Sequence, residues 1–287
     1  MKKFKIKSFC KINLSLRVLK KLNNGYHSIR SLITFCDLYD IILISKIHGT
    51  KDQINFSGKF KKGINKKSNT IVKVLDLLRE KNFLRKQFFK INIKKNIPQG
   101  SGLGGGSGNA ANLLNFFILK MNLKLTNNQI KKTANQIGSD VPVFLKNKNT
   151  LVTGKNNNLL RLNHKFKLNV LIVYPNIISS TQRIYKNNKV FTLYKPQINF
   201  RKKNKKQLMN YLKSEKNDLE KTVVKFYSKV GEIINILKSQ KGCHFSRVTG
   251  SGSACIGVFS DMRTAILTQK LIKIKFPNYW SFVSKTM

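Results

Sequence analysis

The sequence predicts a folded protein of mixed strands and helices. Of its 287 residues, 41% are hydrophobic and 10% aromatic, which is typical of a chain with a large buried core and not of a disordered one. Residues 89–121 add a direct sign of mixed structure, because an alternating apolar pattern is followed by a run of glycines and then by a helical apolar period. The length suggests one or two domains.

The N-terminal third reads mainly as strand. Residues 4–18 alternate between apolar and polar and residues 29–47 are largely apolar, which predicts two strands with a turn at 22–25 between them. The basic, Gly- and Asn-containing stretch 57–69 predicts a loop. Residues 70–80 predict a helix, because their apolar residues fall on one helical face.

The most informative stretch follows. Phe89, Ile91 and Ile93 alternate with polar residues and predict a strand, which ends before Pro98. Six glycines lie between 100 and 108, and a helical period comes directly after them. A strand, a glycine-rich loop and a helix can turn several backbone N–H groups towards one anion. A flexible linker is the alternative, but a linker would not need an apolar helix directly behind it.

Two common phosphate loops do not fit this stretch. Gly100-x-Gly102-x-x-Gly105 matches the dinucleotide-binding string, but residues 109–139 contain no acid to bind a ribose. A Walker A loop needs Gly-Lys followed by Ser or Thr, whereas the Gly-Lys pairs at 58–59 and 154–155 are followed by Phe and Asn. A phosphate loop of another kind remains.

The rest of the chain alternates between the two kinds of element. Thr126 is predicted to cap a helix over 127–137 that Gly138 ends, and strands are predicted within 143–153 and 168–174.

The C-terminal part is predicted to begin with a Lys-rich loop that runs into a helix over 195–217. Helices at 218–238 and 261–275 and strands at 245–248 and 255–259 are predicted to follow.

The net charge of +45 has two interpretations. It could mark a nucleic-acid or anionic-membrane partner. Alternatively it reflects Lys and Asn enrichment along the whole chain, which the even spread of charge and the excess of Lys over Arg favour. We therefore predict no membrane partner and no specific nucleic-acid partner.

The cysteines and the N-terminus predict a reduced, cytoplasmic location. Cys10, Cys36, Cys243 and Cys255 are far apart and form no metal or disulfide pattern. Lysines interrupt any signal-peptide core near the N-terminus, and no 18-residue apolar run occurs.

Asp140 is the only acid between Glu80 and Glu215. It follows Gly138 and precedes Pro142, so it could cap the next helix or act in catalysis. Beside a phosphate loop, a carboxylate can accept the proton of a substrate hydroxyl during phosphoryl transfer.

Lys11 lies in a predicted strand that becomes mainly apolar from this point on, and Asn13 lies on the same face of that strand. It could be a surface charge. Its ammonium could also orient a carboxylate and a substrate oxygen.

These motifs together resemble the GHMP small-molecule kinases. The segment Pro-x-Gly-x-Gly-Leu-Gly-Gly-Gly-Ser at 98–107 is similar to the ATP loop of that family. Lys-Ile-Asn-Leu at 11–14, Asn-Gly-Tyr-His at 24–27, Gly-Ser-Asp-Val-Pro at 138–142 and Thr-Gly-Ser-Gly-Ser-Ala-Cys at 249–255 have the order and spacing of one branch. Members of that branch use ATP to phosphorylate the 2-hydroxyl of 4-diphosphocytidyl-2-C-methyl-D-erythritol in the methylerythritol phosphate route to isoprenoid precursors.

The resemblance implies roles for individual residues. Lys11 and Asp140 would form the catalytic pair. Asn13, Tyr26, His27 and Tyr185 would bind the substrate, with His27 hydrogen-bonded to the cytosine edge and the tyrosines in contact with the ring. ATP would be bound by Asn69, Lys95, Pro98, Gln99, Gly100, Ser101, Gly102, Leu103, Gly104, Gly105, Gly106, Ser107 and Gly108.

One position departs from the family pattern, since Gly108 stands where a Ser or Thr is usual. Tyr185 follows a segment that also departs from the family's Pro-Thr-Pro. Mg²⁺ is expected with ATP, and its ligands would be phosphate oxygens, waters and the Ser107 hydroxyl, with no further protein ligand named.

The implied fold is α+β with two domains. An ATP-binding domain of the ribosomal-protein-S5 type would span 1–155 and a substrate-binding domain would span 156–287, with a boundary in the Gly-Lys-Asn-Asn-Asn stretch at 154–158. The protein is expected to be a monomer or a weak homodimer. The alternatives are another GHMP kinase and a basic RNA-binding protein with a vestigial loop.

Overall fold

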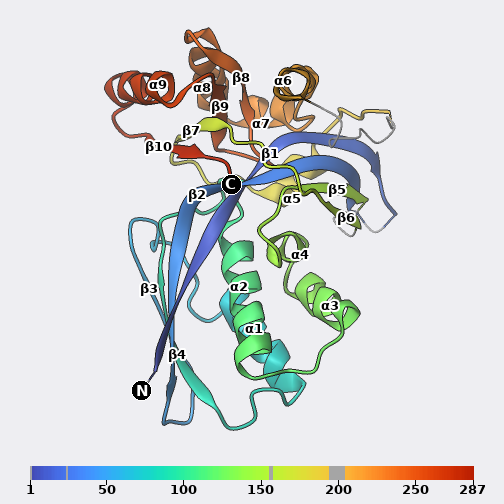
Figure 1. The fold of residues 1–287 in the computed structure, drawn as a ribbon, viewed down its shortest axis with the longest axis vertical. Helices are drawn as coiled ribbons and strands as arrows, with labels where there is room; N and C mark the ends of the chain where they lie inside the picture. The colour runs from blue at the N-terminus through green and yellow to red at the C-terminus, as the bar shows by residue number, and fades with distance from the viewer. Residues whose placement is uncertain (1, 24, 155–157, 194–203) are drawn as a thin grey trace. The chain divides into compact units, whose positions relative to one another are not determined.

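The computed structural model describes residues 2–23, 25–154, 158–193 and 204–287. These form two compact units, which are described separately. The first unit comprises Met1–Cys10, Leu38–Gln99 and Gly104–Asn147, and the second comprises Lys11–Asp37, Gly100–Leu103 and Lys148–Met287. Two long strands, β1 (Lys3–Lys21) and β2 (His27–Ile47), contribute residues to both units (Figure 1).

The first unit is a sheet with helices on one side (Figure 1). Residues 41–47 of β2 pair antiparallel with β4, and β3 adds a parallel strand to β4. The helices pack on one another, and the buried face of α1 is formed by Ile71, Val74, Leu75 and Leu78. The elements are β3 (Gln53–Ser57), α1 (Thr70–Glu80), β4 (Phe88–Lys94), α2 (Gly105–Lys120), α3 (Asn127–Ile137) and α4 (Val141–Phe144).

Local signals placed α1 and α3 of this unit correctly. Thr126 caps α3 through a capping box with Gln129, and Gly138 ends it, as predicted. The strand predicted from 143 is wrong over its first half. Residues 141–144 form the helical turn α4, because Pro142 presets the backbone of a first helical turn.

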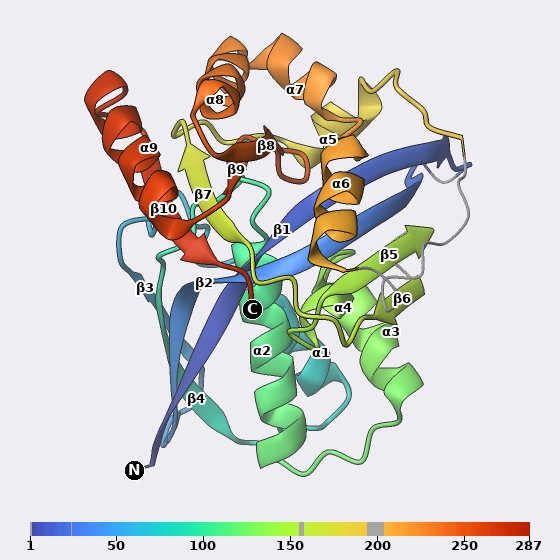
Figure 2. The same ribbon diagram turned by 45° about the horizontal axis from the view of Figure 1, so that its top comes forward.

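The second unit contains two groups of strands. Residues 29–33 of β2 pair with β5, which pairs with β6, and a separate four-stranded sheet has the order β10-β7-β9-β8. The helices α8 and α9 pack on that sheet over one apolar core, and Figure 2 shows them beside β7 and β9. The elements are β5 (Thr150–Gly154), β6 (Asn158–Arg161), β7 (Asn169–Tyr174), α5 (Thr181–Lys186), α6 (Lys205–Ser214), α7 (Glu220–Phe226), α8 (Ser228–Ser239), β8 (Cys243–Val248), β9 (Cys255–Phe259), α9 (Met262–Lys275) and β10 (Trp280–Lys285).

Two predictions for this unit need correction. The single helix predicted over 218–238 is two helices, because Tyr227 has an extended backbone with φ −140° and ψ 81°. The short strands β6 and β10 were not predicted, because each is a strand by virtue of pairing with its neighbour, β5 or β7.

The predicted domain boundary at 155 and the start of the Lys-rich 195–217 stretch lie outside the described residues, so the division at 155 stays a prediction. Within the described part of the chain, no helix is long and apolar enough to cross a membrane.

Candidate active site

Lys11 and Asn13 form a buried polar pair on β1, in the second unit. Their exposed fractions are 5% and 3%. Lys11 Nζ donates to Asn13 Oδ1 over 2.5 Å, and Asn13 Nδ2 donates to Ser31 Oγ over 2.7 Å. A buried ammonium needs such acceptors, and this contact holds the Lys11 head group in one place.

The glycine-rich motif at 249–255 closes around this pair. The Asn13 N–H donates to Thr249 Oγ1 over 2.9 Å. A Cβ on Gly250 would lie 3.2 Å from both Lys11 Nζ and Asn13 Oδ1, so the absence of a side chain lets the backbone approach the ammonium.

Residues 100–103 of the predicted ATP loop belong to the same unit. The Lys11 N–H donates to the Leu103 carbonyl and the Ala254 N–H donates to the Ser101 carbonyl, each over 3.0 Å. The structure thus brings together the predicted catalytic lysine, the centre of the loop and the glycine-rich motif at 249–255.

Gly102 is the tightest point of this arrangement. Its φ is +80°, and a Cβ there would lie 2.1 Å from the carbonyl oxygen of Thr249. That oxygen belongs to the backbone and cannot rotate away, so only glycine fits.

The remaining loop glycines begin α2 in the first unit. Gly104 is the N-cap residue, with a left-handed φ of 72°, and no side chain caps the helix. The N–H groups of the first turn therefore lie at the N-terminal end of the helix, which attracts anions. Thr70 Oγ1 donates to the Gly106 carbonyl over 3.0 Å, and Gln99 Nε2 donates to the carbonyls of Phe60 and Lys62. These contacts tie both ends of the loop to neighbouring segments.

Gly108 has a packing reason to lack a side chain. A Cβ there would lie 3.0 Å from Ser8 Oγ and 3.1 Å from Phe144 Cδ1. Ser8 is fully buried and its hydroxyl accepts from Asn112 Nδ2 over 3.3 Å. The space that a Ser or Thr at 108 would need is therefore partly filled by Ser8 in this chain.

Asn69 and Lys95 have structural roles in the first unit. Asn69 is the N-cap of α1, and its Oδ1 accepts from the N–H groups of Ile71 and Val72. The Lys95 ammonium forms an ion pair with Asp40, and the Lys95 side chain is buried. Burial lowers the pKa of Lys95, and the Asp40 carboxylate opposes that shift. Whether either residue also contacts ATP stays a prediction.

Asp140 stands at the N-cap position of α4, yet its side chain makes no capping hydrogen bond. The alternative that its carboxylate serves as a helix cap is therefore not supported. Asp140 lies in the first unit and Lys11 in the second, so their pairing stays a prediction.

His27 lies among aromatic rings in the second unit. Its ring centroid is 5.2 Å from that of Tyr185 and 6.4 Å from that of Phe191, with which it is stacked. His27 is 8% exposed, whereas Tyr26 is 50% exposed. Burial and then the nearby charge of Lys21 lower the pKa of His27 from its ordinary 6.5, which favours the neutral imidazole. The structure brings Tyr185 to His27 as expected and adds Phe191, which the sequence motifs did not indicate.

This pKa shift predicts a pH dependence of stability. Because folded His27 binds a proton less readily than unfolded His27, the unfolded state takes up more protons below the unfolded pKa of 6.5. The contribution of His27 to the free energy of unfolding is complete above that pKa and is lost as the pH falls towards the folded pKa. Between about pH 7 and about pH 5.5, the thermal midpoint of His27→Gln is expected to fall less than that of the wild type. Parallel curves for the two proteins would contradict this.

Comparison with known proteins identifies the family. Sequence profiles of the GHMP kinases N terminal domain and the GHMP kinases C terminal domain match residues 69–148 and 197–278. A protein of Pelagibacter ubique (strain HTCC1062) named 4-diphosphocytidyl-2-C-methyl-D-erythritol kinase is 40% identical over 287 residues, with 100% of both chains covered. A protein of the same name from Caldanaerobacter subterraneus subsp. tengcongensis is 32% identical, with 99% of this chain and 97% of that protein covered.

The chain belongs to the GHMP kinase family.

Solved structures agree with this family at the level of the fold. A crystal structure of 4-(cytidine 5'-diphospho)-2C-methyl-D-erythritol kinase has a TM-score of 0.78 at 20% identity and covers 99% of both chains. A mevalonate kinase has a TM-score of 0.66 at 17% identity, with 99% of both chains covered. The α+β GHMP kinase fold and an ATP-dependent small-molecule kinase activity are thereby established for this chain.

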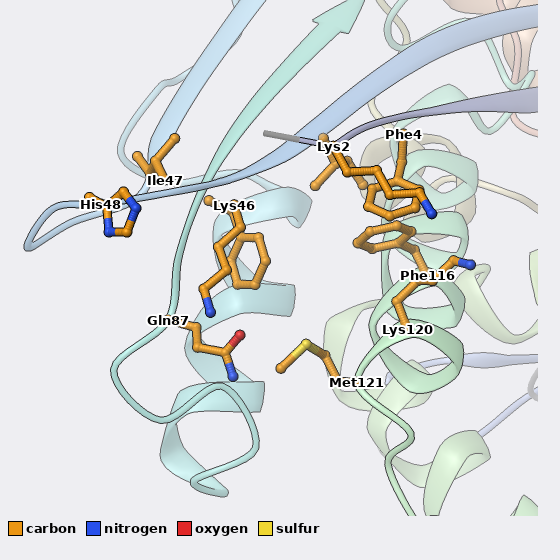
Figure 3. Close-up of a pocket in the computed structure, with 11 residues that line it drawn as sticks. Lys2, Phe4, Lys46, Ile47, His48, Gln87, Phe116, Lys120 and Met121 are labelled. Carbon is orange, nitrogen blue, oxygen red and sulfur yellow. The ribbon is translucent and has the colours of Figure 1, made fainter.

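The first unit of this GHMP kinase contains a cavity of about 460 Å³ (Figure 3). It is formed by the N-terminal end of β1, the end of β2, the start of β4 and the C-terminal half of α2. None of the residues predicted to bind ATP or its acceptor lines it. Its walls are Lys2, Phe4, Ile44, Lys46, Ile47, His48, Gln87, Phe89, Phe116, Lys120 and Met121.

Sequence reasoning missed some contacts around the candidate site of this GHMP kinase. Thr249 was part of a motif, but its contact with Asn13 joins positions that are distant in the sequence. Asp40 was missed altogether, although a single acid within the otherwise apolar segment 38–44 was a usable signal. Among the described residues, no group of three or more His, Cys, Asp or Glu side chains is arranged to hold a metal ion.

Proposed function

We propose that this GHMP kinase transfers the γ-phosphoryl group of ATP to the 2-hydroxyl of 4-diphosphocytidyl-2-C-methyl-D-erythritol, in the methylerythritol phosphate route to isoprenoid precursors. The name and full-length similarity of the Pelagibacter protein support the choice of acceptor. The observation that carries it within this chain is the aromatic surrounding of His27, because stacked rings and a neutral imidazole suit a nucleobase.

Asp140 and Lys11 are the catalytic residues in this proposal. The Asp140 carboxylate accepts the proton of the 2-hydroxyl as that oxygen bonds to the γ-phosphorus and the bond to ADP breaks. The Lys11 ammonium, held by Asn13, stabilises negative charge on the reacting oxygens. Since the transition state is loose, positioning and charge stabilisation matter more than the strength of the base.

The loop at 98–108 holds the phosphates of ATP, with Asn69 and Lys95 near the nucleotide. Tyr26, His27, Tyr185 and Asn13 hold the acceptor. The uncapped N-terminus of α2 and its lack of acids in the first turn support the placement of phosphate there.

The residues around the loop fit Mg²⁺ only when it is bound together with ATP. Phosphate oxygens and waters would be its main ligands, with the Ser107 hydroxyl in the first turn of α2 as the nearby protein donor. When bound, it would neutralise charge on the β- and γ-phosphates.

We also propose a cytoplasmic enzyme that works as a monomer or weak homodimer, without a membrane or specific nucleic-acid partner. In this proposal the N-terminal part, to residue 155, carries the ATP loop, and the acceptor is held by Asn13, Tyr26 and His27 of that part together with Tyr185 of the C-terminal part.

A panel of acceptors tests the proposed function. ADP release is measured with the diphosphocytidyl substrate, with mevalonate and with homoserine. ADP release is expected with the diphosphocytidyl substrate, and none is expected with mevalonate or homoserine. His27→Gln is expected to raise the KM of the diphosphocytidyl substrate at least about tenfold while the KM of ATP stays unchanged, because hydrogen bonds to a buried group are lost. Equal turnover of mevalonate or homoserine would contradict the choice of acceptor. Tight sequence-selective RNA binding without ATP turnover would favour the RNA-binding alternative.

A further inference from the structure

A fully buried carboxylate lies behind the phosphate loop in the first unit. Asp40, on β2, has no exposed surface. It forms an ion pair with the Lys95 ammonium and accepts from Asn109 Nδ2 over 2.9 Å. The backbone N–H groups of Asn96 and Ile97 donate to its other oxygen over 2.7 Å and 2.9 Å. One carboxylate thus joins β2, the segment after β4, and α2.

This ion pair is costly to bury. The Lys95 residue is only 3% exposed. Removing both charges from water costs several kcal/mol per ion, and the attraction of the pair offsets that cost only with good geometry and further hydrogen bonds. Apolar side chains of similar volume would often be as stable, so stability alone does not account for this ion pair.

The pair lies directly against the first residue of α2. A Cβ on Gly105 would lie 3.3 Å from Lys95 Nζ and 3.0 Å from Ile97 Cγ2. A positive charge at a helix N-terminus is unfavourable because the helix dipole is positive there. The Asp40 carboxylate compensates for that charge, so the ammonium can stay beneath the loop.

Two further observations indicate that these side chains have little freedom. A Cβ on Gly58 would lie 2.6 Å from the carbonyl oxygen of Lys95, so the backbone at 95 is closely enclosed. Asn109 Oδ1 is buried without a hydrogen-bond partner among the described residues. The amide must present its Nδ2 to Asp40, because the opposite orientation would place an oxygen against the carboxylate.

We propose that Asp40 and Lys95 are positioning residues of the phosphate loop. Their ion pair, together with Asn109, holds the first turn of α2 in the geometry that binds the phosphates of ATP. Lys95 acts through Gly105, against which its ammonium lies, and through Asp40, which holds Asn109. Its ammonium does not contact ATP directly. The inference rests on the assignment of 98–108 as an ATP loop.

The test compares Asp40→Asn, Lys95→Met and the double variant in the full chain. The readouts are the Kd of a fluorescent N-methylanthraniloyl ATP, the KM of ATP and of the acceptor, kcat, and the thermal midpoint. Each single variant is expected to raise the Kd and KM for ATP at least about tenfold, because the loop loses its geometry. The acceptor KM is expected to stay within about twofold. The double variant is expected to bind ATP better than Asp40→Asn, because no unpaired charge is left.

Leu78→Ala is the control for loss of stability alone. Leu78 is fully buried in α1 of the same unit, and its loss leaves a cavity but no charge. This variant is expected to lower the thermal midpoint and keep the wild-type Kd for ATP. If Asp40→Asn does not fold, Asn109→Ala replaces it, because this variant leaves no unpaired charge buried. Asn109→Ala is also expected to raise the Kd for ATP.

Two results would overturn the proposal. If Asp40→Asn, measured well below its thermal midpoint, binds ATP as the wild type does, the pair is only structural. If Lys95→Met weakens ATP binding while Asp40→Asn and Asn109→Ala do not, Lys95 is a direct ligand. A wild-type protein that binds the ATP analogue but phosphorylates another acceptor would contradict the proposed substrate and leave this proposal intact.

Discussion

Asp140→Asn is expected to lower kcat by about 10²- to 10⁴-fold, the usual contribution of a positioned general base. The amide has nearly the same size as the carboxylate but cannot accept the hydroxyl proton. The thermal midpoint is measured beside kcat, so that a loss of activity can be separated from a loss of folding. The measurement is ADP release with ATP and the diphosphocytidyl substrate, with the KM of each determined separately.

Asp37→Asn is the matched control, since it removes an exposed carboxylate of β2 with the same change of charge. It is expected to leave kcat unchanged. Lys11→Met is expected to lower kcat as Asp140→Asn does, with a larger loss of stability because Asn13 loses a buried partner. A kcat for Asp140→Asn within about threefold of the wild type would remove Asp140 from the proposed catalytic pair.

Gly102→Ala is expected to have the second large effect, on both folding and ATP binding. The left-handed backbone costs roughly 1–2 kcal/mol with a side chain, and the overlap with the Thr249 carbonyl oxygen at 2.1 Å adds about 1–3 kcal/mol of overpacking. The loop must move to relieve this overlap. That movement would break the hydrogen bonds of Leu103 with Lys11 and of Ser101 with Ala254. Denaturant unfolding and titration with the ATP analogue measure the two effects.

Gly106→Ala is the control for stability within the same loop. A Cβ there would meet only Thr70 Oγ1, at 3.7 Å, which is an ordinary contact. Because alanine favours a helix over glycine, the free energy of unfolding is expected to be unchanged or to rise by up to about 1 kcal/mol. If Gly102→Ala were as stable as Gly106→Ala, the packing explanation for Gly102 would be wrong.

Elements with strong local signals could be predicted closely from the sequence. The helix predicted at 70–80 is α1, and the one predicted at 127–137 is α3, with its cap and its stop at the expected residues. In both cases the information is local: one apolar face, and residues that satisfy the end groups of the helix.

Elements that depend on distant partners were harder to predict. β3, β6 and β10 are four to six residues long and are strands because they pair with β4, β5 and β7. The apolar residues at 141–144 fit a strand as well as a helix, and the periodicity of so short a run does not distinguish the two.

For this protein, the sequence by itself determined the kind of site. The glycines, the missing ribose acid, the missing Walker lysine and the solitary Asp140 defined a phosphate loop with one candidate base. Each of these is a matter of residue type and spacing along one stretch of chain. Only the tertiary structure decided which groups support that loop. The Lys11–Asn13–Thr249 contacts and the Asp40–Lys95–Asn109 contacts join segments far apart in the chain, because a buried charge must find its partners wherever the fold places them.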